Sequence, residues 1–214
     1  MKKQFSKKTF FRINIEIFFL TVYIFFTFTN SQQKWMVVLI TGIALSLFFS
    51  RVYCGWMCQM NTVFRSINWV YGKLGIKRPK TPLFFKHKAF KYIILVIILL
   101  SLILTMKLRI KVNLTLYVSI IGIVATLFLE ESFWHNYICP YGTIQSFSSR
   151  PAKLSVKIDE DNCKNCGTCQ KVCPAEAIKT LDSKKRRVTK NLCLTCFKCQ
   201  EVCPPKVITY RTWQ

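Results

Sequence analysis

Eight of the eleven cysteines in this 214-residue chain fall into two runs of identical spacing near the C-terminus. The runs are Cys163-x2-Cys166-x2-Cys169-x3-Cys173-Pro174 and Cys193-x2-Cys196-x2-Cys199-x3-Cys203-Pro204. Two residues between ligands let a tight loop wrap three thiolates around one corner of an iron–sulfur cubane. A pair of zinc sites is the alternative, because Cys-x2-Cys also suits zinc. Zinc motifs lack the third cysteine at this spacing, so the runs predict two [4Fe–4S] clusters.

The fourth cysteine of each run begins a short helix and cannot turn back to the cluster held by its own loop. It is therefore expected to bind the other cluster. The predicted ligands of cluster 1 are Cys163, Cys166, Cys169 and Cys203, and those of cluster 2 are Cys193, Cys196, Cys199 and Cys173. Residues 155–210 resemble the dicluster bacterial ferredoxins, and an internal repeat aligns residues 157–163 with residues 187–193.

The second loop departs from the first at Phe197, where the first loop has Gly167. This bulky side chain is expected to shield cluster 2 from water. Lys164, Lys171 and Lys198 are expected to stabilise the more negative reduced clusters and so to raise their potentials.

The first 151 residues have a different composition, with apolar blocks separated by basic segments. Hydrophobic residues make up 51% of the whole chain, and 32 Lys and Arg face only 9 Asp and Glu. The apolar blocks cover residues 13–29, 35–50, 92–106 and 114–129. Each is near the lower limit of about 17 residues for a spanning helix. Buried helices of a soluble core are the alternative, but four blocks that contain only one charged residue favour four transmembrane helices.

The formal net charge of +23 raises nucleic-acid binding as an alternative. The basic residues lie between apolar blocks, so no nucleic-acid partner is expected. The two histidines, His87 and His135, lie outside the blocks, which argues against a bis-histidine haem. The sequence also has no Cys-x2-Cys-His motif, no glycine-rich nucleotide loop and no acid–base pair, so no catalytic residue is predicted.

Lys and Arg are unevenly divided between the loops, which predicts the orientation in a membrane. The N-terminal segment and the loop after the second block carry Lys2, Lys3, Lys7, Lys8, Arg12, Arg51, Arg65, Lys73, Lys77, Arg78, Lys80, Lys86, Lys88 and Lys91. The other two loops carry Lys34, Lys107, Arg109 and Lys111. We therefore expect a multi-pass protein of the inner membrane with both termini and the cysteine runs in the cytoplasm. An aromatic belt at that face is expected from Tyr53, Trp56, Trp69, Trp134 and Tyr137.

The first block behind Met1 also resembles a signal peptide, but no small-x-small cleavage site follows it, so an uncleaved anchor is predicted. Glu16 is the one charged residue inside a block and has two interpretations. An ionisable group at membrane depth can mark a functional site. Alternatively Glu16, which is only about one turn into the helix, reaches the headgroups or pairs with Arg12, and this second interpretation is favoured.

Three further cysteines lie near the ends of the second and fourth blocks, namely Cys54, Cys58 and Cys139. With this order of parts, nearly the whole chain resembles the NapH-type membrane polyferredoxins of periplasmic nitrate reductase systems, which have relatives in nitrous oxide and methylamine metabolism. The resemblance implies four helices, two Cys-x3-Cys-Pro motifs at the cytoplasmic membrane face, a C-terminal dicluster ferredoxin and electron transfer at the quinone pool. Gln59 replaces the first motif's proline and His135 the second motif's first cysteine.

Cys54 and Cys58 are four residues apart, as are His135 and Cys139, so each pair shares one helix face. If the second and fourth blocks pack together, three thiols and one imidazole converge. That set suits a tetrahedral metal ion, Cu(I) or an unusual Fe–S centre, so the sequence predicts an additional metal site at these four residues. The alternative is an interfacial histidine beside reduced, buried cysteines.

The predicted fold is thus an α-helical membrane anchor of four transmembrane helices in residues 1–151, followed by an α+β dicluster ferredoxin-like domain in residues 152–214. The predicted function is single-electron transfer between the quinone pool, or a membrane partner, and another redox protein. A copper reductase or maturation factor for a respiratory enzyme is the alternative. Redox sensing ranks below both because no DNA-binding motif supports it.

Overall fold

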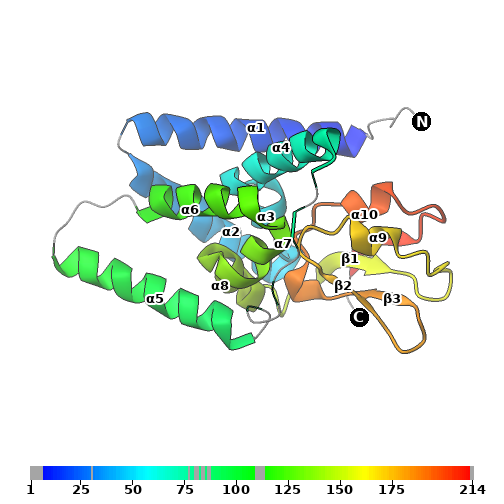
Figure 1. The fold of residues 1–214 in the computed structure, drawn as a ribbon. Coiled ribbons are helices and arrows are strands. Elements are labelled where there is room, and N and C mark those ends of the chain that lie inside the picture. The colour runs from blue at the N-terminus through cyan, green and yellow to red at the C-terminus, as the bar shows by residue number, and fades with distance from the viewer. Residues whose placement is uncertain are drawn as a thin grey trace.

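The computed structural model of the chain describes residues 7–29, 31–76, 78–79, 82, 85, 88–108 and 114–212. A helical half, residues 7–148, and a cysteine-rich half, residues 154–212, lie end to end (Figure 1). Several residues used above lie outside the described part of the chain, namely Lys2, Lys3, Lys77, Lys80, Lys86, His87, Arg109 and Lys111.

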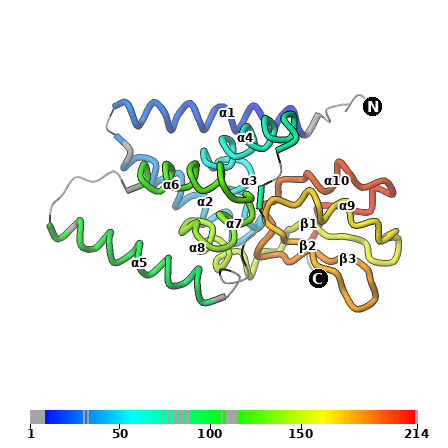
Figure 2. Tube along the Cα trace, viewed as in Figure 1, coloured from blue at the N-terminus to red at the C-terminus, as the bar shows by residue number. Residues whose placement is uncertain are grey.

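Each of the four apolar blocks forms a helix. They are α1 (Lys7–Phe28), α2 (Trp35–Phe49, after the short 3-10 helix Gln32–Lys34), α5 (Lys88–Lys107) and α6 (Leu114–Phe128). The trace in Figure 2 shows α1 starting beside the cysteine-rich half and running away from it, while α6 returns toward that half. The N-terminal end of α1 and the C-terminal ends of α2 and α6 are therefore positioned at the junction between the halves.

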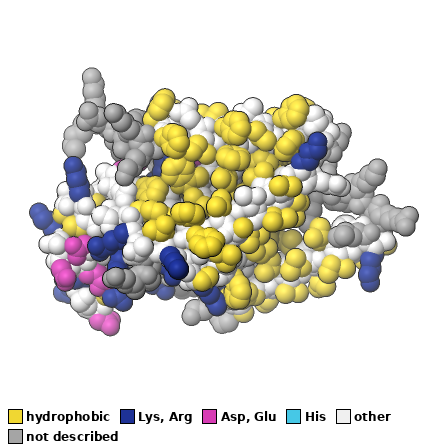
Figure 3. Space-filling view, turned by 180° about the vertical axis from the view of Figure 1, so that it is seen from behind, with side chains coloured by type: hydrophobic (Ala, Val, Ile, Leu, Met, Phe, Trp, Pro, Cys, Tyr) yellow, Lys and Arg dark blue, Asp and Glu magenta, His cyan; other side chains and the backbone are white. Residues whose placement is uncertain are grey.

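One helix among the described residues, Thr9–Phe28, is long and apolar enough to cross a membrane. The apolar helices Trp35–Phe49, Ala89–Thr105 and Thr115–Phe128 are shorter. At 1.5 Å per residue the 15 residues of α2 extend about 22 Å, against a hydrocarbon core of about 30 Å. All four helices nevertheless expose large apolar side chains, and these form a broad hydrophobic face over the helical half (Figure 3).

The segment after α2, predicted as a loop, is instead mostly helical. It forms α3 (Val52–Trp56) and α4 (Gln59–Leu74), and α4 ends at Gly75 in the left-handed conformation, with φ 69°. Met60 and Phe64, four residues apart, place one face of α4 in the core. This spacing is the sequence signal that the loop prediction overlooked.

The predicted aromatic belt is wrong for two of its members. Tyr53 and Trp134 are 1% and 2% exposed, because α3 and α4 fold back over the helix ends and enclose them. Trp134 packs edge-to-face on Phe64 at 6.2 Å between ring centroids. Trp69, at 63% exposed, is the member that faces outward most clearly.

A second irregular segment follows α6. It consists of α7 (Glu131–Phe133), the π-helical turn η3 (Trp134–Ile138) and α8 (Pro140–Ser148). Because π-helical turns are rare and often occur at functional sites, this turn, which contains His135 and is followed by Cys139, is a candidate functional site.

Glu16 is buried in an ion cluster between α1 and α4. Its carboxylate lies 3.5 Å from Arg12 and 2.6 Å from Arg65, and the Glu16 side chain is 4% exposed. The expected pairing with Arg12 is present, whereas exposure of Glu16 toward headgroups is not. Arg65 is a partner from another helix, which the sequence gives no means of pairing with Glu16.

The cysteine-rich half contains two small antiparallel sheets. Strand β1 (Leu154–Ile158) pairs with β4 (Ile208–Thr212), and β2 (Ile178–Thr180) pairs with β3 (Arg186–Val188). Between them lie the short helices α9 (Thr168–Lys171) and α10 (Lys198–Glu201) and the 3-10 turn η4 (Lys190–Leu192). The inner faces contribute the core residues Val156, Ile178, Val188 and Ile208.

The two halves dock through the second cysteine loop. Ser50 donates a hydrogen bond to the carbonyl of Lys190, and Trp56 donates one to the carbonyl of Thr195. A Cβ atom added at Gly55 would lie 2.0 Å from the carbonyl oxygen of Leu194. Glycine at position 55 therefore lets this backbone approach α3 closely.

We predict that Gly55→Ala weakens the docking of the two halves, by roughly 1–3 kcal/mol of overpacking. The matched control is Gly72→Ala in α4, where an added Cβ meets nothing within 4 Å. The control should gain about 0.5–1 kcal/mol from helix propensity. Thermal unfolding in detergent and trypsin cleavage after exposed Lys153 would measure both. Equal behaviour of the two variants would contradict the tight contact at Gly55.

Candidate iron–sulfur centres

The first cysteine cavity is called site 1. Its lining includes Cys163, Cys166 and Cys169 from the first loop and Cys203 from the end of the second run. Gly167, Ile158 and Arg186 complete its walls. The structure thus brings together the four cysteines that the sequence analysis grouped for cluster 1.

The second cavity is called site 2. Its lining includes Cys193, Cys196 and Cys199 from the second loop and Cys173 from the end of the first run. Apolar side chains such as Val156, Ile178 and Phe197 surround these thiols. The four cysteines grouped for cluster 2 therefore also meet at one place.

In each cavity, four cysteine thiols line an apolar space. Four thiolates around an apolar space are the ligand arrangement of a [4Fe–4S] cluster.

Backbone N–H groups point at two of the site 2 sulfurs. Ala177 N lies 3.3 Å from Cys173 Sγ, and Thr195 N lies 3.4 Å from Cys193 Sγ. Such hydrogen bonds to sulfur are one of the means by which a protein sets cluster potentials. Burial raises the pKa of Cys173 to about 11 and that of Cys193 to about 12, so both are protonated thiols at neutral pH. A bound metal cation would displace these protons and give the thiolates.

Phe197 and Gly167 have equivalent roles in the two loops. Both adopt the left-handed conformation at the N-cap of a short helix, with φ 58° at Phe197 and 72° at Gly167. This conformation is easy for glycine and unusual for phenylalanine. Phe197 packs against Trp56 and Tyr210, with ring centroids at 6.1 and 5.6 Å, so its side chain supports the junction between the halves.

Cys58 and Cys139 occupy equivalent places in the helical half. Each is the N-cap of a helix, and each backbone N–H donates to a carbonyl five residues back, at Tyr53 or Trp134, over 2.9 Å. Pro140 and Gln59 then fill the first helical position, which tolerates proline but does not demand it. The departure at Gln59 is thus compatible with the same backbone geometry.

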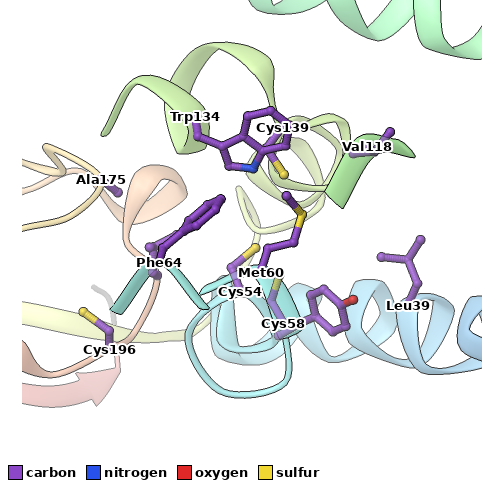
Figure 4. Packing of buried hydrophobic residues seen from close by; sticks show 12 residues of the cluster. Leu39, Cys54, Cys58, Met60, Phe64, Val118, Trp134, Cys139, Ala175 and Cys196 are labelled. Carbon is purple, nitrogen blue, oxygen red and sulfur yellow. The ribbon is translucent and has the colours of Figure 1, made fainter. Parts of the chain in front are cut away.

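The three thiols of the helical half are buried in one packed cluster with Met60 and Trp134 (Figure 4). Cys54 Sγ lies 3.1 Å from Gln145 Oε1, and Cys139 Sγ accepts a hydrogen bond from Gly142 N at 3.3 Å. Burial raises the pKa of Cys54 and Cys58, and it raises that of Cys139 to about 12. These thiols are therefore protonated at neutral pH.

The predicted metal site at Cys54, Cys58, His135 and Cys139 lacks support in this structure. His135 Nε2 lies 3.3 Å from Glu131 Oε1, so its polar partner is a carboxylate and not one of the thiols. The His135 ring packs against Phe64. Burial lowers the pKa of His135, so the ring is neutral. Glu131, which comes four residues earlier on the same helical turn, is the partner that the sequence analysis missed.

Comparison with known proteins assigns the two halves to iron–sulfur families. A family described as "4Fe-4S dicluster domain" matches residues 155–204. A family described as "4Fe-4S binding domain" matches residues 33–77 and 112–158, which contain the equivalent turns at Cys58 and Cys139. The chain is thus similar to the NapH-type ferredoxin proteins. Relatives named NapH and MauN are described as ferredoxin-type proteins.

The ferredoxin-type protein NapH of Haemophilus influenzae is 29% identical over 145 residues, or 60% of this chain and 49% of its own. The methylamine utilization ferredoxin-type protein MauN of Methylobacillus flagellatus is 27% identical over 140 residues, or 60% and 50%. An uncharacterized protein of Methanocaldococcus jannaschii is 28% identical over 142 residues, or 64% and 56%. The chain thus spans about half the length of these relatives. No solved structure matches it.

We predict that Cys139→Ala destabilises the protein by about 1 kcal/mol more than Cys58→Ala. Both changes remove a buried thiol, but the Cys139 sulfur also accepts from Gly142 N at the N-cap of α8. Cys139→Ser should recover most of the loss, because a serine hydroxyl also caps a helix. Thermal unfolding in detergent would compare the three variants. Equal losses in both alanine variants would show that the cap contributes nothing.

Proposed function

We propose that this chain is a membrane-bound electron-transfer protein that carries two [4Fe–4S] clusters, one at site 1 and one at site 2. It would pass single electrons between the quinone pool, or a membrane partner, and another redox protein. The crossed grouping of the eight cysteines into two four-thiol cavities is the observation that carries this proposal.

The chemistry at the two sites would be that of the bound groups. A [4Fe–4S] cluster accepts and donates single electrons at a potential that charge, hydrogen bonds and solvent exposure adjust. The chain's own residues would hold, shield and tune these groups. The names of the relatives NapH and MauN, ferredoxin-type proteins, support electron transfer as the activity.

A membrane location is supported by the helical half. Among the described residues, one helix has the length and composition to span a bilayer, and three further apolar helices are shorter. Their exposed apolar side chains would contact lipid, while charged side chains gather over the cysteine-rich half (Figure 3). We propose four spans in the inner membrane, with both termini and residues 152–214 in the cytoplasm, since the basic loops favour that side.

Anaerobically purified protein should contain about eight Fe and eight acid-labile sulfides, because two cubanes hold that many. Reduced samples should show interacting S = 1/2 centres by EPR. Cys203→Ser should perturb site 1 and Cys173→Ser should perturb site 2, since each belongs to the cavity of the other run.

Zinc without labile sulfide in fresh anaerobic wild-type protein would refute the proposal. If Cys203→Ser damaged only site 2, the crossed assignment would be wrong. Reduction of the clusters by a quinol in membrane vesicles would support a link to the quinone pool.

The sidedness is tested by reporter fusions. A fusion at Gln33, in the short turn between α1 and α2, should report the periplasm, and one at Gln214 should report the cytoplasm. Alkaline phosphatase and green fluorescent protein give opposite signals in the two compartments. The same compartment for both positions would be incompatible with four spans.

A further inference from the structure

The two cysteine loops share their spacing but have opposite surroundings. In the first loop, Asn162, Lys164, Asn165 and Cys166 are exposed. At the equivalent positions of the second loop, Leu194 and Thr195 are each 2% exposed, and Cys196 is 8% exposed. Site 1 therefore borders solvent through its loop, whereas the loop of site 2 is enclosed.

The helical half encloses the second loop by donating hydrogen bonds to its carbonyl groups. Arg51 Nη1 lies 3.4 Å from the Leu192 oxygen, and Trp56 Nε1 lies 3.0 Å from the Thr195 oxygen. Arg12 Nη1, from α1, donates to the oxygen of Cys196, which is itself one of the site 2 cysteines. A guanidinium group thus contacts the backbone that would hold the second cluster.

This guanidinium group is buried and belongs to a charged network. Arg12 is 5% exposed and pairs with Glu16, which in turn pairs with Arg65. Arg12, Glu16 and Arg65 form a buried network with little water to screen its charges, and Glu201 adds a second carboxylate at its edge. Thr9, one turn earlier on α1, also donates to Glu201 in α10, which fixes α1 against the second run.

The cations around site 1 are more open to water. Lys164 is exposed, and Arg186 is half-buried with Nη1 donating to Thr180. Solvent weakens the effect of such charges on a neighbouring group. The sequence predicts that Lys164 and Lys171 raise a cluster potential, but both are exposed, so their effect is expected to be weaker than that of Arg12. Lys198, the third lysine of that prediction, is half-buried and lines site 2, where its charge would act in the same direction as that of Arg12.

We propose that Arg12 is a positioning residue that raises the potential of site 2, and that site 2 is the inner and site 1 the solvent-facing electron site. The inference rests on the proposed function, because it requires both sites to be loaded. Reduction adds negative charge, and a buried cation beside the site stabilises the reduced form. Removing that cation should lower the potential of site 2 alone.

The test is an EPR-monitored redox titration of the full-length protein in detergent under anaerobic conditions. Cys166→Ser and Cys196→Ser identify the signals, because these ligands belong to site 1 and site 2 through their own loops. In Arg12→Gln, the reduced-to-oxidised ratio of site 2 at a fixed potential should fall about tenfold, which is about 59 mV for one electron. Site 1 should not move, and Arg12→Lys should recover most of the shift.

Glu16→Gln removes a negative charge beside Arg12, which is the opposite of the change in Arg12→Gln, and should therefore raise the potential of site 2. Lys164→Gln is the matched control at the exposed loop and should leave site 2 unchanged. Shifts of the same sign in Arg12→Gln and Glu16→Gln, or equal shifts at both sites, would overturn the inference. They would indicate a general disturbance of the fold.

A second measurement needs no variant of Arg12. A water-soluble dysprosium chelate should enhance the spin relaxation of the site 1 signal severalfold more than that of site 2. Equal enhancement would overturn the assignment of inner and outer sites. Wild-type protein without iron and labile sulfide would refute the proposed function instead, and the two failures are therefore distinguishable.

Discussion

The docking of the second cysteine loop depends on backbone carbonyl groups that lose water where the two halves meet. A buried carbonyl without a donor costs about 1–3 kcal/mol, so each one constrains the residue opposite. The carbonyls of Leu192, Thr195 and Cys196 receive Arg51, Trp56 and Arg12, respectively. Long side chains are thus needed where the loop is farther from the helices, and a glycine, Gly55, where it touches them.

The helical half contains two helix starts of similar geometry, and a cysteine is the N-cap residue of both. Cys58 and Cys139 each stand between a short helical turn and the helix that follows, and each donates its N–H back to an enclosed aromatic residue. Cys54 and His135, which follow those aromatic residues, have taken different partners, Gln145 and Glu131. The two turns therefore share a backbone geometry, while the side chains that follow the aromatic residues differ, with Cys54 in one turn and His135 in the other.

Sequence patterns predicted the elements that local spacing encodes. The cysteine spacing located both loops, and hydropathy located the four long helices close to their observed bounds. Contacts between distant positions were not predictable in this way. The pairing of Glu16 with Arg65 and the contact of Arg12 with the Cys196 carbonyl each join residues on separate elements. Such contacts produce no periodic pattern in the sequence. Helix α4 was missed for another reason, because its apolar positions were judged only as part of a basic loop.

The cysteine-rich half has a small core. Two sheets of two strands each, joined by helices of four residues, bury few apolar side chains, and isolated hairpins of this size are marginal in water. Further order would come from the ligands that its eight cysteines would hold and from the helical half that binds its second loop. These two sources meet at Cys196, whose sulfur lines site 2 and whose carbonyl accepts from Arg12. A cluster at site 2 would thus be coupled to docking on the helical half through one residue, whereas the lining of site 1 comes from the cysteine-rich half alone.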